Sequence, residues 1–461
     1  MTFSKLGLSD PIVQAVREAG YTRPTAVQEK VIPVVNAGRD LVATSQTGTG
    51  KTAGFVLPIL EGLRSEYTRR AKRIRALILV PSRELALQVE ANIQKYSKYL
   101  DFTSMAMVGG LDVEPQKQAL IDGVDIVVAT PGRLLDMAHQ RALHFDALEY
   151  LVLDEADRML DMGFVADINK IIERLPAKRQ NLLFSATMSD AVRLLADTAI
   201  DNAFEVSIDV DKATVYKISQ WVVSVDKHNK SALLSQLIIE REWSQALIFI
   251  RTKHGAAKLV SQLEKRGIKA EAIHGDRSQS VRTQILADFK SGDIGFLVAT
   301  GVAARGLDID GLTRVVNYDL PDDANDYIHR IGRTGRAGAS GEAVSLVSFD
   351  DFKRMCAIER RLDQVLERKV IEGFVTAKEL PASNLSFNLT RGEPDKEARK
   401  KDKAAKKSNF VKKKHAAKKA KSLKAEKTTK TSTSASQSKP SKGASGERSK
   451  LDFLNSNKKG S

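Results

Sequence analysis

Cysteine is nearly absent from this chain, because Cys356 is the only one in 461 residues. An intramolecular disulfide is therefore excluded, and a cysteine-based zinc site is disfavoured. Long apolar runs are missing too, since no stretch of about 18 apolar residues occurs and residues 1–19 have no apolar segment behind a basic one. We expect no membrane partner and no secretory signal, and therefore a cytosolic or nuclear protein, with the cytoplasm preferred.

Excess charge is missing from most of the chain. The formal net charge of +16 lies in residues 391–461, which hold 23 Lys and Arg against 7 Asp and Glu, whereas residues 1–390 hold 50 of each. A polyanion-binding site on the folded part must therefore depend on the local arrangement of residues. From residue 391 the chain consists mainly of Lys, Ala, Ser and Thr, a composition that predicts disorder.

Two series of short apolar runs alternate with helix-length amphipathic stretches, as in βα units around a buried parallel sheet. The first series has candidate strands at 40–43, 76–80, 103–108, 125–129, 150–153 and 181–184, with helices such as 83–96 and 165–174. Residues 201–215 break this rhythm, and a second series follows at 218–225, 246–250, 269–273, 295–299, 314–318 and 343–347. We predict an α/β protein with parallel sheets, divided into a first segment (1–30), two domains (31–205 and 217–378), a linker (206–216) and a disordered basic tail (379–461).

One glycine-rich segment lies between a predicted strand and a predicted helix, the context that a phosphate-binding loop requires. It consists of Ser45, Gln46, Thr47, Gly48, Thr49, Gly50, Lys51 and Thr52. Its glycines let backbone N–H groups face phosphate oxygens, Lys51 can reach the β and γ phosphates, and the Thr52 hydroxyl can bind Mg²⁺. Ser45 replaces the first glycine of the usual pattern, which is acceptable if residue 45 needs no positive φ. The alternative is a glycine-rich turn without a function.

A second segment, residues 151–157, ends a predicted buried strand with acids, so it places carboxylates at the edge where open α/β sheets bind ligands. Asp154 would hold Mg²⁺, partly through water, and Glu155 would orient and deprotonate an attacking water. An acidic N-cap of a helix is the structural alternative.

The segment Asp154-Glu-Ala-Asp157 resembles the motif that names the DEAD-box ATP-dependent RNA helicases, and further motifs of that family follow in order over residues 3–375. The resemblance implies two tandem RecA-like domains that hydrolyse ATP between them. It is closest to the bacterial RhlE group, and His329 separates it from the DEAH relatives. Residues 20–28 resemble the family's Q motif, which implies an adenine site formed by Gln28, Tyr21 and Phe3. A glutamine amide can pair with adenine N6 and N7, and an aromatic ring can stack on the base.

The resemblance also assigns the remaining site residues. Asp308 would contact the ribose, and Ser185, Thr187, Asp157 and His329 would couple nucleotide to RNA. The implied RNA contacts are Pro81, Arg83, Gly110, Thr130, Arg133, Arg251, Gln279, Arg282 and Thr300. Ser82 stands where the family usually has Thr, Gly301 where it has Asp or another polar residue, and residues 130–133 are also compatible with a plain turn into a helix.

Arg333 and Arg336 are the implied arginine fingers, which stabilise charge on a transferring phosphoryl group. Because these arginines belong to the second domain, whereas Lys51 and Glu155 belong to the first, hydrolysis should require the domains to close.

The resemblance implies ATP and Mg²⁺ as cofactors, and RNA-stimulated hydrolysis that separates short duplexes locally and non-processively and remodels ribonucleoproteins. Single-stranded RNA and short duplexes are the expected partners, with ribosomal precursors or the RNA-decay machinery as candidates. The tail is either a non-specific RNA tether or a solubility tail or nuclear-import signal. Two other functions remain open: a nucleotide-switched clamp on RNA that hardly unwinds, and a DNA-translocating ATPase.

Overall fold

The computed structural model describes residues 2–45, 48–64, 71–207, 218–301, 303–304, 307, 309, 312–335, 341–383 and 385. Four predicted site residues lie outside the described residues: Gln46, Thr47, Asp308 and Arg336. The same holds for residues 208–216 of the predicted linker and for the predicted tail from residue 386 onward.

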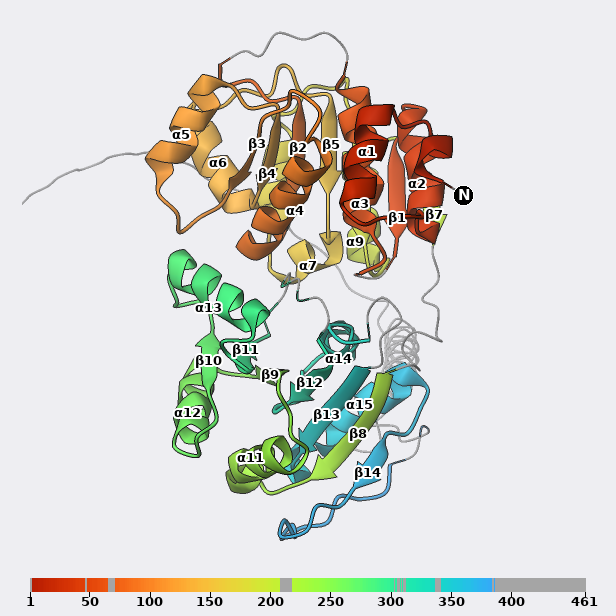
Figure 1. The fold of residues 1–461 in the computed structure, drawn as a ribbon. Coiled ribbons are helices and arrows are strands. Elements are labelled where there is room, and N and C mark those ends of the chain that lie inside the picture. The colour runs from red at the N-terminus through yellow and green to blue at the C-terminus, as the bar shows by residue number, and fades with distance from the viewer. Residues whose placement is uncertain are drawn as a thin grey trace, which may run out of the picture. The chain divides into compact units, whose positions relative to one another are not determined.

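The first domain is an alternation of strands and helices (Figure 1). Its strands are β1 (Leu41–Thr44), β2 (Ala76–Leu79), β3 (Ser104–Met107), β4 (Ile126–Ala129), β5 (Tyr150–Leu153), β6 (Gln180–Ser185) and β7 (Phe204–Ser207). Its helices are η1 (Phe3–Leu6), α1 (Asp10–Glu18), α2 (Ala26–Asn36), α3 (Lys51–Gly62), α4 (Arg83–Tyr96), α5 (Val113–Asp122), α6 (Pro131–His139), α7 (Ala156–Asp161), α8 (Val165–Ile172) and α9 (Asp190–Ala199).

The second domain repeats this plan. Its strands are β8 (Ile218–Ser224), β9 (Ala246–Ile250), β10 (Ala270–Ile273), β11 (Phe296–Thr300), β12 (Arg314–Asn317), β13 (Gly341–Val347) and β14 (Glu367–Lys369). Its helices are η2 (Lys227–Asn229), α11 (Lys230–Glu240), α12 (Lys253–Glu264), α13 (Gln279–Ser291), α14 (Ala324–Ile331), η4 (Phe349–Asp351) and α15 (Phe352–Leu362).

Each domain contains one parallel seven-stranded sheet. The strand orders are β3-β4-β2-β5-β6-β1-β7 and β10-β11-β9-β12-β13-β8-β14. All recorded pairings within them are parallel. Since parallel neighbours require a crossover, the intervening helices must cover the two faces. The predicted α/β architecture with two parallel sheets is confirmed.

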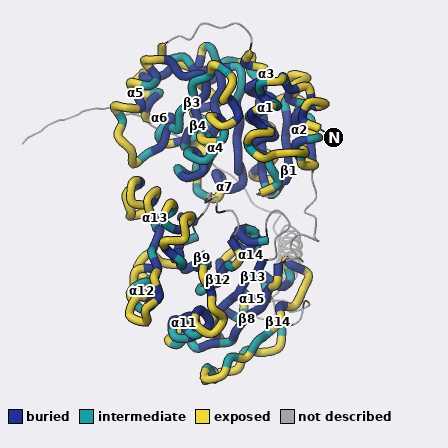
Figure 2. Tube along the Cα trace, viewed as in Figure 1, coloured by how far each residue is buried: buried dark blue, intermediate teal, exposed yellow. Residues whose placement is uncertain are grey.

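The core of the first domain lies on both faces of its sheet, because successive side chains of a strand point to opposite faces. In β1, Leu41 and Ala43 join a cluster with α1 to α4, whereas Val42 joins the cluster on the other face, formed with α5, α6, α8 and α9. Figure 2 shows these strands buried and the outer faces of the helices exposed. Phe184 of β6 is fully buried against Phe55, and truncating such a ring to alanine typically costs about 3–5 kcal/mol.

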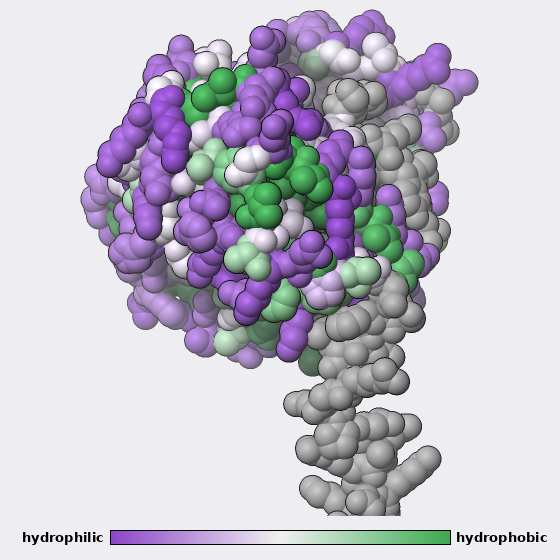
Figure 3. Space-filling model, turned by 90° about the horizontal axis from the view of Figure 1, so that it is seen from below, coloured by the Kyte–Doolittle hydropathy of each residue, from purple (hydrophilic) through white to green (hydrophobic). Residues whose placement is uncertain are grey.

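Large apolar side chains are exposed at only a few described positions, among which Val370 and Val375 stand out at 93% and 90% exposure. The face in Figure 3 accordingly shows mostly polar residues around a smaller apolar group. Within the described ranges, no helix combines the length and the apolar character needed to cross a membrane.

Two strands correct the sequence analysis. Residues 201–215 were predicted to interrupt the series of strands and no strand was predicted after residue 347, but β7 lies in the first interval and β14 follows α15. Both strands are at sheet edges, and three of the four β7 residues are at least partly exposed. β7 contains Glu205 and Ser207, and β14 consists of Glu367, Arg368 and Lys369, so neither has the continuous apolar run that is typical of a buried parallel strand.

Candidate active site and RNA interface

The strand order divides the carboxyl edge of the first sheet into two regions. β5, β6 and β1 are neighbours, so the acidic segment, the segment from Ser185 to Thr187 and the glycine-rich loop meet at one part of that edge. β3, β4 and β2 are also neighbours, and the segments after them carry Gly110, Thr130 and Arg83. The motifs assigned to ATP and to RNA are therefore separated along a single sheet.

The glycine-rich loop has the backbone that its glycines allow. Gly48 and Gly50 have φ values of 83° and 88°, and α3 begins directly after Gly50. Ser45 is not among the residues with positive φ, so serine at this position causes no backbone strain. The Lys51 ammonium is buried and donates to the Ser45 carbonyl at 3.1 Å. Thr52 lies in the first turn of α3, half-buried.

Gln28 fixes this loop from the side. Its Oε1 accepts from the Thr25 backbone N–H at 2.9 Å, and its Nε2 donates to the Gly50 carbonyl at 3.0 Å. A Cβ on Gly50 would lie only 2.5 Å from that Nε2, so glycine is required by close approach as well as by φ. The oxygen and the nitrogen of the Gln28 amide, which is expected to pair with adenine, thus both bond to backbone groups of this chain. Of its expected companions, Phe3 is buried in the core, and the Tyr21 hydroxyl lies 3.4 Å from that of Tyr96.

The two acids after β5 are buried, with Asp154 at 3% and Glu155 at 6% exposure. Glu155 has a left-handed backbone, φ 54° and ψ 49°, which costs a non-glycine residue about 1–3 kcal/mol and is typical of functional sites. Glu155 stands at the N-cap of α7 but makes no side-chain capping bond; its carboxylate instead accepts from Arg158 at 2.7 Å. The Glu155 side chain therefore does not cap helix α7 in this structure.

The environment separates the pKa values of the two acids. Burial is the main cause that raises the pKa of Asp154 to about 6, with Lys51 opposing the shift. Burial also opposes ionisation of Glu155, but the positive charges of Arg158, Lys51 and Arg333 together lower its pKa. Arg333 comes from the second domain, so that domain contributes to the charge around Glu155.

The segment assigned to coupling is bonded to the acidic segment. Asp157 Oδ2 accepts from both the backbone N–H and the hydroxyl of Thr187, each at 3.0 Å. The Ser185 hydroxyl donates to the Thr187 carbonyl at 2.6 Å. His329 belongs to α14, and burial, then Arg158, lowers its pKa to about 4 against the opposing charges of Asp157 and Glu155. The structure therefore brings the four predicted coupling residues together.

The residues assigned to RNA in the first domain line one cavity of about 590 Å³, which includes Pro81, Arg83, Gly110, Thr130 and Arg133. Gly275, Arg282 and Ala303 of the second domain complete its wall. Gly110 has a φ of 79°, and a Cβ there would collide with the Arg83 guanidinium.

The predicted RNA contacts Arg282 and Gln279 are both bonded to a side chain of the first domain. Arg282 Nη2 lies 2.7 Å from Glu84 Oε1, and Gln279 Nε2 donates to the same oxygen at 3.2 Å. All three side chains are buried. Because Glu84 begins α4 and the other two begin α13, this group links the two domains.

The remaining predicted residues belong to the second domain, two at strand ends and one after α14. Thr300 ends β11 half-buried, and Arg251 follows β9 with 42% of its side chain exposed. Arg333 is buried and donates to the Leu307 carbonyl at 2.6 Å.

Sequence reasoning missed two residues of this site. Glu84 directly follows the expected RNA contact Arg83 but received no role, and its partners are 195 and 198 residues away, so no local pattern reveals them. Arg158 was detectable, because it lies three residues after Glu155, the spacing at which opposite charges meet on a helix.

A glycine-rich loop, a buried acid pair and an arginine from a second α/β domain define a nucleoside-triphosphate hydrolase built from paired domains. The family model described as DEAD/DEAH box helicase matches residues 25–195, and the one described as helicase conserved C-terminal domain matches residues 229–338. This chain belongs to the DEAD-box ATP-dependent RNA helicases, and it is an RNA-dependent ATPase.

Relatives and solved structures agree with this assignment. The chain is 40% identical over 384 residues to the DEAD-box ATP-dependent RNA helicase CshA of Streptococcus pneumoniae, covering 82% of this chain and 72% of that protein. It is 38% identical to RhpA of Helicobacter pylori, covering 79% and 73%. S. cerevisiae Dbp5 bound to RNA and ADP BeF3 superimposes with a TM-score of 0.73 at 33% identity, covering 80% and 95% of the two chains. Mss116p bound to ssRNA and AMP-PNP gives 0.72 at 30% identity, covering 80% and 78%. These matches confirm tandem RecA-like domains, whereas membership of the RhlE group stays a prediction.

Proposed function

We propose that RNA binding closes the two domains on ATP, and that each hydrolysis event separates a short RNA duplex locally and without continued translocation. The observation that carries this proposal is the shared environment of Glu155. Its carboxylate is buried in the first domain, yet Arg333 of the second domain is, after Arg158 and Lys51, among the charges that lower its pKa. Full activation therefore requires both domains around the same acid.

In the proposed reaction, Lys51 leaves the Ser45 carbonyl to bind the β and γ phosphates, and Glu155 orients the attacking water and accepts its proton. The lowered pKa keeps Glu155 ionised at neutral pH, so its carboxylate can orient the attacking water by accepting a hydrogen bond from it. Arg333, with Arg336 from outside the described residues, would stabilise charge on the transferring phosphoryl group.

Mg²⁺ is the metal that these residues fit. The Thr52 hydroxyl and the Asp154 carboxylate are hard oxygen donors, and in the part of the chain that the structure describes no group of three or more His, Cys, Asp and Glu could hold a metal. Mg²⁺ prefers such sparse sites, binding one or two protein oxygens together with waters and substrate phosphates. When bound, it neutralises phosphate charge.

The nucleotide would be recognised by Gln28, Phe3, Tyr21 and Asp308. For Gln28 this requires its amide to exchange a chain contact for the adenine edge while still supporting Gly50. Changes at the phosphates would reach the RNA side through the Asp157–Thr187 pair and His329.

RNA would be held by its backbone. The cavity beside Arg83, Gly110 and Arg133 combines guanidinium groups with a close approach of main chain, which suits phosphates and sugars better than base edges. We infer little sequence preference, with single-stranded RNA and short duplexes as substrates. Ribosomal precursors and RNA-decay complexes are the candidate assemblies, with the cytoplasm as the place where ATP and such RNAs meet.

The first experiment measures steady-state ATP hydrolysis without nucleic acid, with single-stranded RNA and with DNA of matched sequence. RNA alone should stimulate the wild type, and Glu155→Gln should reduce the stimulated rate by about 10²- to 10⁴-fold, the usual contribution of a general base. Retained binding of RNA and ATP by the variant excludes misfolding as the cause. Equal stimulation by DNA would contradict the proposed substrate.

A nucleotide-switched clamp is the alternative, because the same motifs would grip RNA without repeated strand separation. Duplex release under multiple turnover decides between the two. A protein that releases less than one duplex per molecule while hydrolysing ATP continuously is a clamp. The basic tail is tested separately, since deletion of residues 391–461 should flatten the salt dependence of RNA affinity if the tail is a tether.

A further inference from the structure

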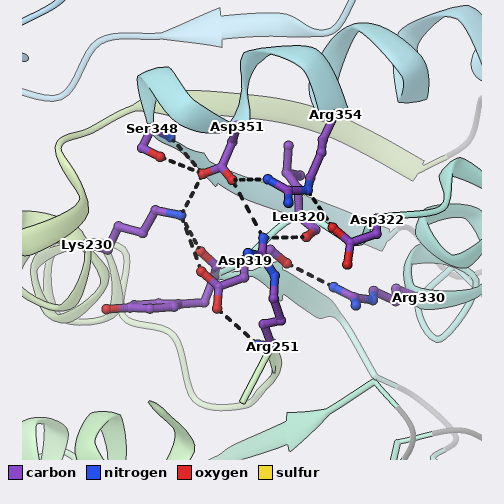
Figure 4. A network of polar contacts seen from close by, with 10 residues as sticks. Lys230, Arg251, Asp319, Leu320, Asp322, Arg330, Ser348, Asp351 and Arg354 are labelled. Carbon is purple, nitrogen blue, oxygen red and sulfur yellow. Dashed lines mark hydrogen bonds and ion pairs between the residues drawn. The ribbon is translucent and has the colours of Figure 1, made fainter.

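Asp319 lies between two functional segments of the second domain. It follows β12, next to β9 in the sheet, and its backbone N–H donates to the Phe249 carbonyl at 3.2 Å. Its carboxylate accepts from the Arg251 backbone N–H at 3.0 Å, and its own carbonyl accepts from Arg330 Nη1 at 2.9 Å. One residue thus contacts the start of the segment with the proposed RNA contact Arg251 and the helix that carries His329 (Figure 4).

A buried ammonium holds this residue in place. The Lys230 side chain is 2% exposed, and its Nζ donates to the Tyr318 carbonyl at 2.8 Å. The same Nζ lies 3.6 Å from Asp319 and 3.2 Å from Asp351. Burial opposes ionisation of Asp351, but Lys230 and the bonds from Ser348 outweigh it and lower its pKa. The positive charge of Lys230 therefore stabilises the carboxylates of Asp319 and Asp351, which come from separate parts of the chain.

Arg251 has a fixed backbone and a loosely held guanidinium. The fixed contact is the 3.0 Å bond from its N–H to Asp319. Its Nη2 lies 3.4 Å from the Leu320 carbonyl and 3.8 Å from Asp351, and 42% of the side chain is exposed. A phosphate could therefore take the guanidinium at little cost, while the backbone of Arg251 stays attached to Asp319.

Arg330 reaches the same place from α14. Besides its bond to the Asp319 carbonyl, it pairs with Asp326 at 3.1 Å, and its guanidinium stacks over the Phe249 ring at 4.9 Å. Since Arg333 follows Arg330 by three residues, a displacement of the Asp319 main chain changes the anchor of the segment that carries the proposed arginine finger.

We propose that Asp319 is a positioning residue that couples RNA binding at Arg251 to the α14 arginines, and that Lys230 and Asp351 hold it in register. The proposal rests on the proposed RNA contact of Arg251. Asp319 itself touches neither RNA nor ATP; it acts through the two arginines that it anchors.

The test is a double-mutant cycle on RNA-stimulated ATP hydrolysis, with Asp319→Ala, Arg251→Ala and the double variant. At saturating RNA, Asp319→Ala should lower kcat by roughly 3- to 30-fold, the usual size of coupling between linked sites. In the Arg251→Ala background the same change should lower kcat by less than about twofold. A residue with only a structural role would instead multiply the two losses and lower the unfolding temperature in proportion.

Two further variants make the outcome unambiguous. Asp319→Asn preserves the size of the side chain and an acceptor oxygen for Arg251, but it removes the charge that faces Lys230. It therefore gives a second double-mutant cycle that does not depend on the folding of the alanine variant. We expect kcat to fall by about threefold, and not to fall in the Arg251→Ala background. Glu240→Gln is the control, because this exposed acid at the far end of α11 accepts from Gln236 one turn before it, away from Lys230, and the change should leave kcat unchanged.

The RNA contact of Arg251 and the positioning role of Asp319 can be refuted separately. If Arg251→Ala leaves RNA affinity intact, the proposed RNA contact is wrong. If Arg251→Ala weakens RNA binding but the cycle with Asp319 is multiplicative, the RNA contact stands and the positioning role of Asp319 is refuted.

Discussion

Replacing Glu84 by glutamine should weaken RNA binding in the presence of ATP, although it removes a negative charge beside an RNA cavity. Glu84 Oε1 receives Arg282 at 2.7 Å and Gln279 at 3.2 Å, and all three residues are less than 10% exposed. The substitution leaves the Arg282 guanidinium buried without a counter-charge. Because the partners belong to different domains, the cost falls on their association and not on the fold of either.

The size of the effect follows from the burial of this group. Removing one partner of a buried ion pair typically costs about 3–5 kcal/mol. The glutamine oxygen still accepts one hydrogen bond, worth about 1 kcal/mol, so a loss of about 2–4 kcal/mol remains. At about 1.4 kcal/mol per factor of ten, the affinity of the closed protein for RNA should fall by roughly 30- to 1000-fold.

The assay is fluorescence anisotropy of a labelled single-stranded RNA, with and without a non-hydrolysable ATP analogue. Glu84→Gln should weaken binding with the analogue and change it little without. Glu90→Gln is the control on the same helix, because its carboxylate bonds to Ser104 within the first domain. The charge-swapped pair, Glu84→Arg with Arg282→Glu, should recover part of the loss. Tighter RNA binding by Glu84→Gln would refute the reasoning, since it would mean that Glu84 acts on RNA only by repulsion.

Three further outcomes are expected. Burial lowers the pKa of His329 to about 4, so the closed protein favours the neutral imidazole. The stabilisation of the closed form is therefore complete above a pH of about 6.5 and is lost as the pH falls toward 4. RNA affinity measured with the ATP analogue across this pH range should fall accordingly. Gly50→Ala should raise the KM for ATP at least about tenfold, because alanine there adopts a positive φ and meets Gln28 Nε2 at 2.5 Å; an unchanged KM would contradict this. Gly301→Asp should lower kcat by roughly 3- to 30-fold, since its Cβ would lie 3.3 Å from Nη2 of Arg330, which Asp326 and the Asp319 carbonyl hold in place; an unchanged kcat would contradict the anchoring of Arg330.

The sequence predicts the central strands well, because a strand buried on both faces needs an unbroken apolar run. β5 at Tyr150–Leu153 and β9 at Ala246–Ile250 match the predicted ranges residue by residue. β7 and β14 were missed because their residues are mostly polar and partly or fully exposed, whereas the edge strands β3 and β10 keep apolar residues and were predicted. An apolar run in the sequence is therefore missing where a strand does not have to be buried.

The candidate site shows the same limit at longer range. The phosphate loop is predictable because its glycines, Lys51 and Thr52 are adjacent in sequence, and the structure adds the φ values that the glycines permit. The bond from Thr187 to Asp157 spans 30 residues and was anticipated only through the family resemblance. The contacts of Glu84 join helices of two different domains, and those of Lys230 join segments about 90 to 120 residues apart, so no local pattern encodes them.

The order of strands also explains why one small domain can respond to two ligands. The motifs proposed for ATP follow β1, β6 and β5, and those proposed for RNA follow β2, β4 and β3, so the two proposed sites lie at the same edge of the sheet without sharing residues. The helix after β2 begins with Arg83, which lines the RNA cavity, and Glu84, which pairs with Arg282 of the second domain. We therefore propose that RNA bound at Arg83 also orders Glu84 for closure, because the two residues are consecutive, and that closure in turn orders Arg83 for RNA. Thermodynamic linkage demands such reciprocity of two coupled ligands, and this pair at the start of α4 would provide it.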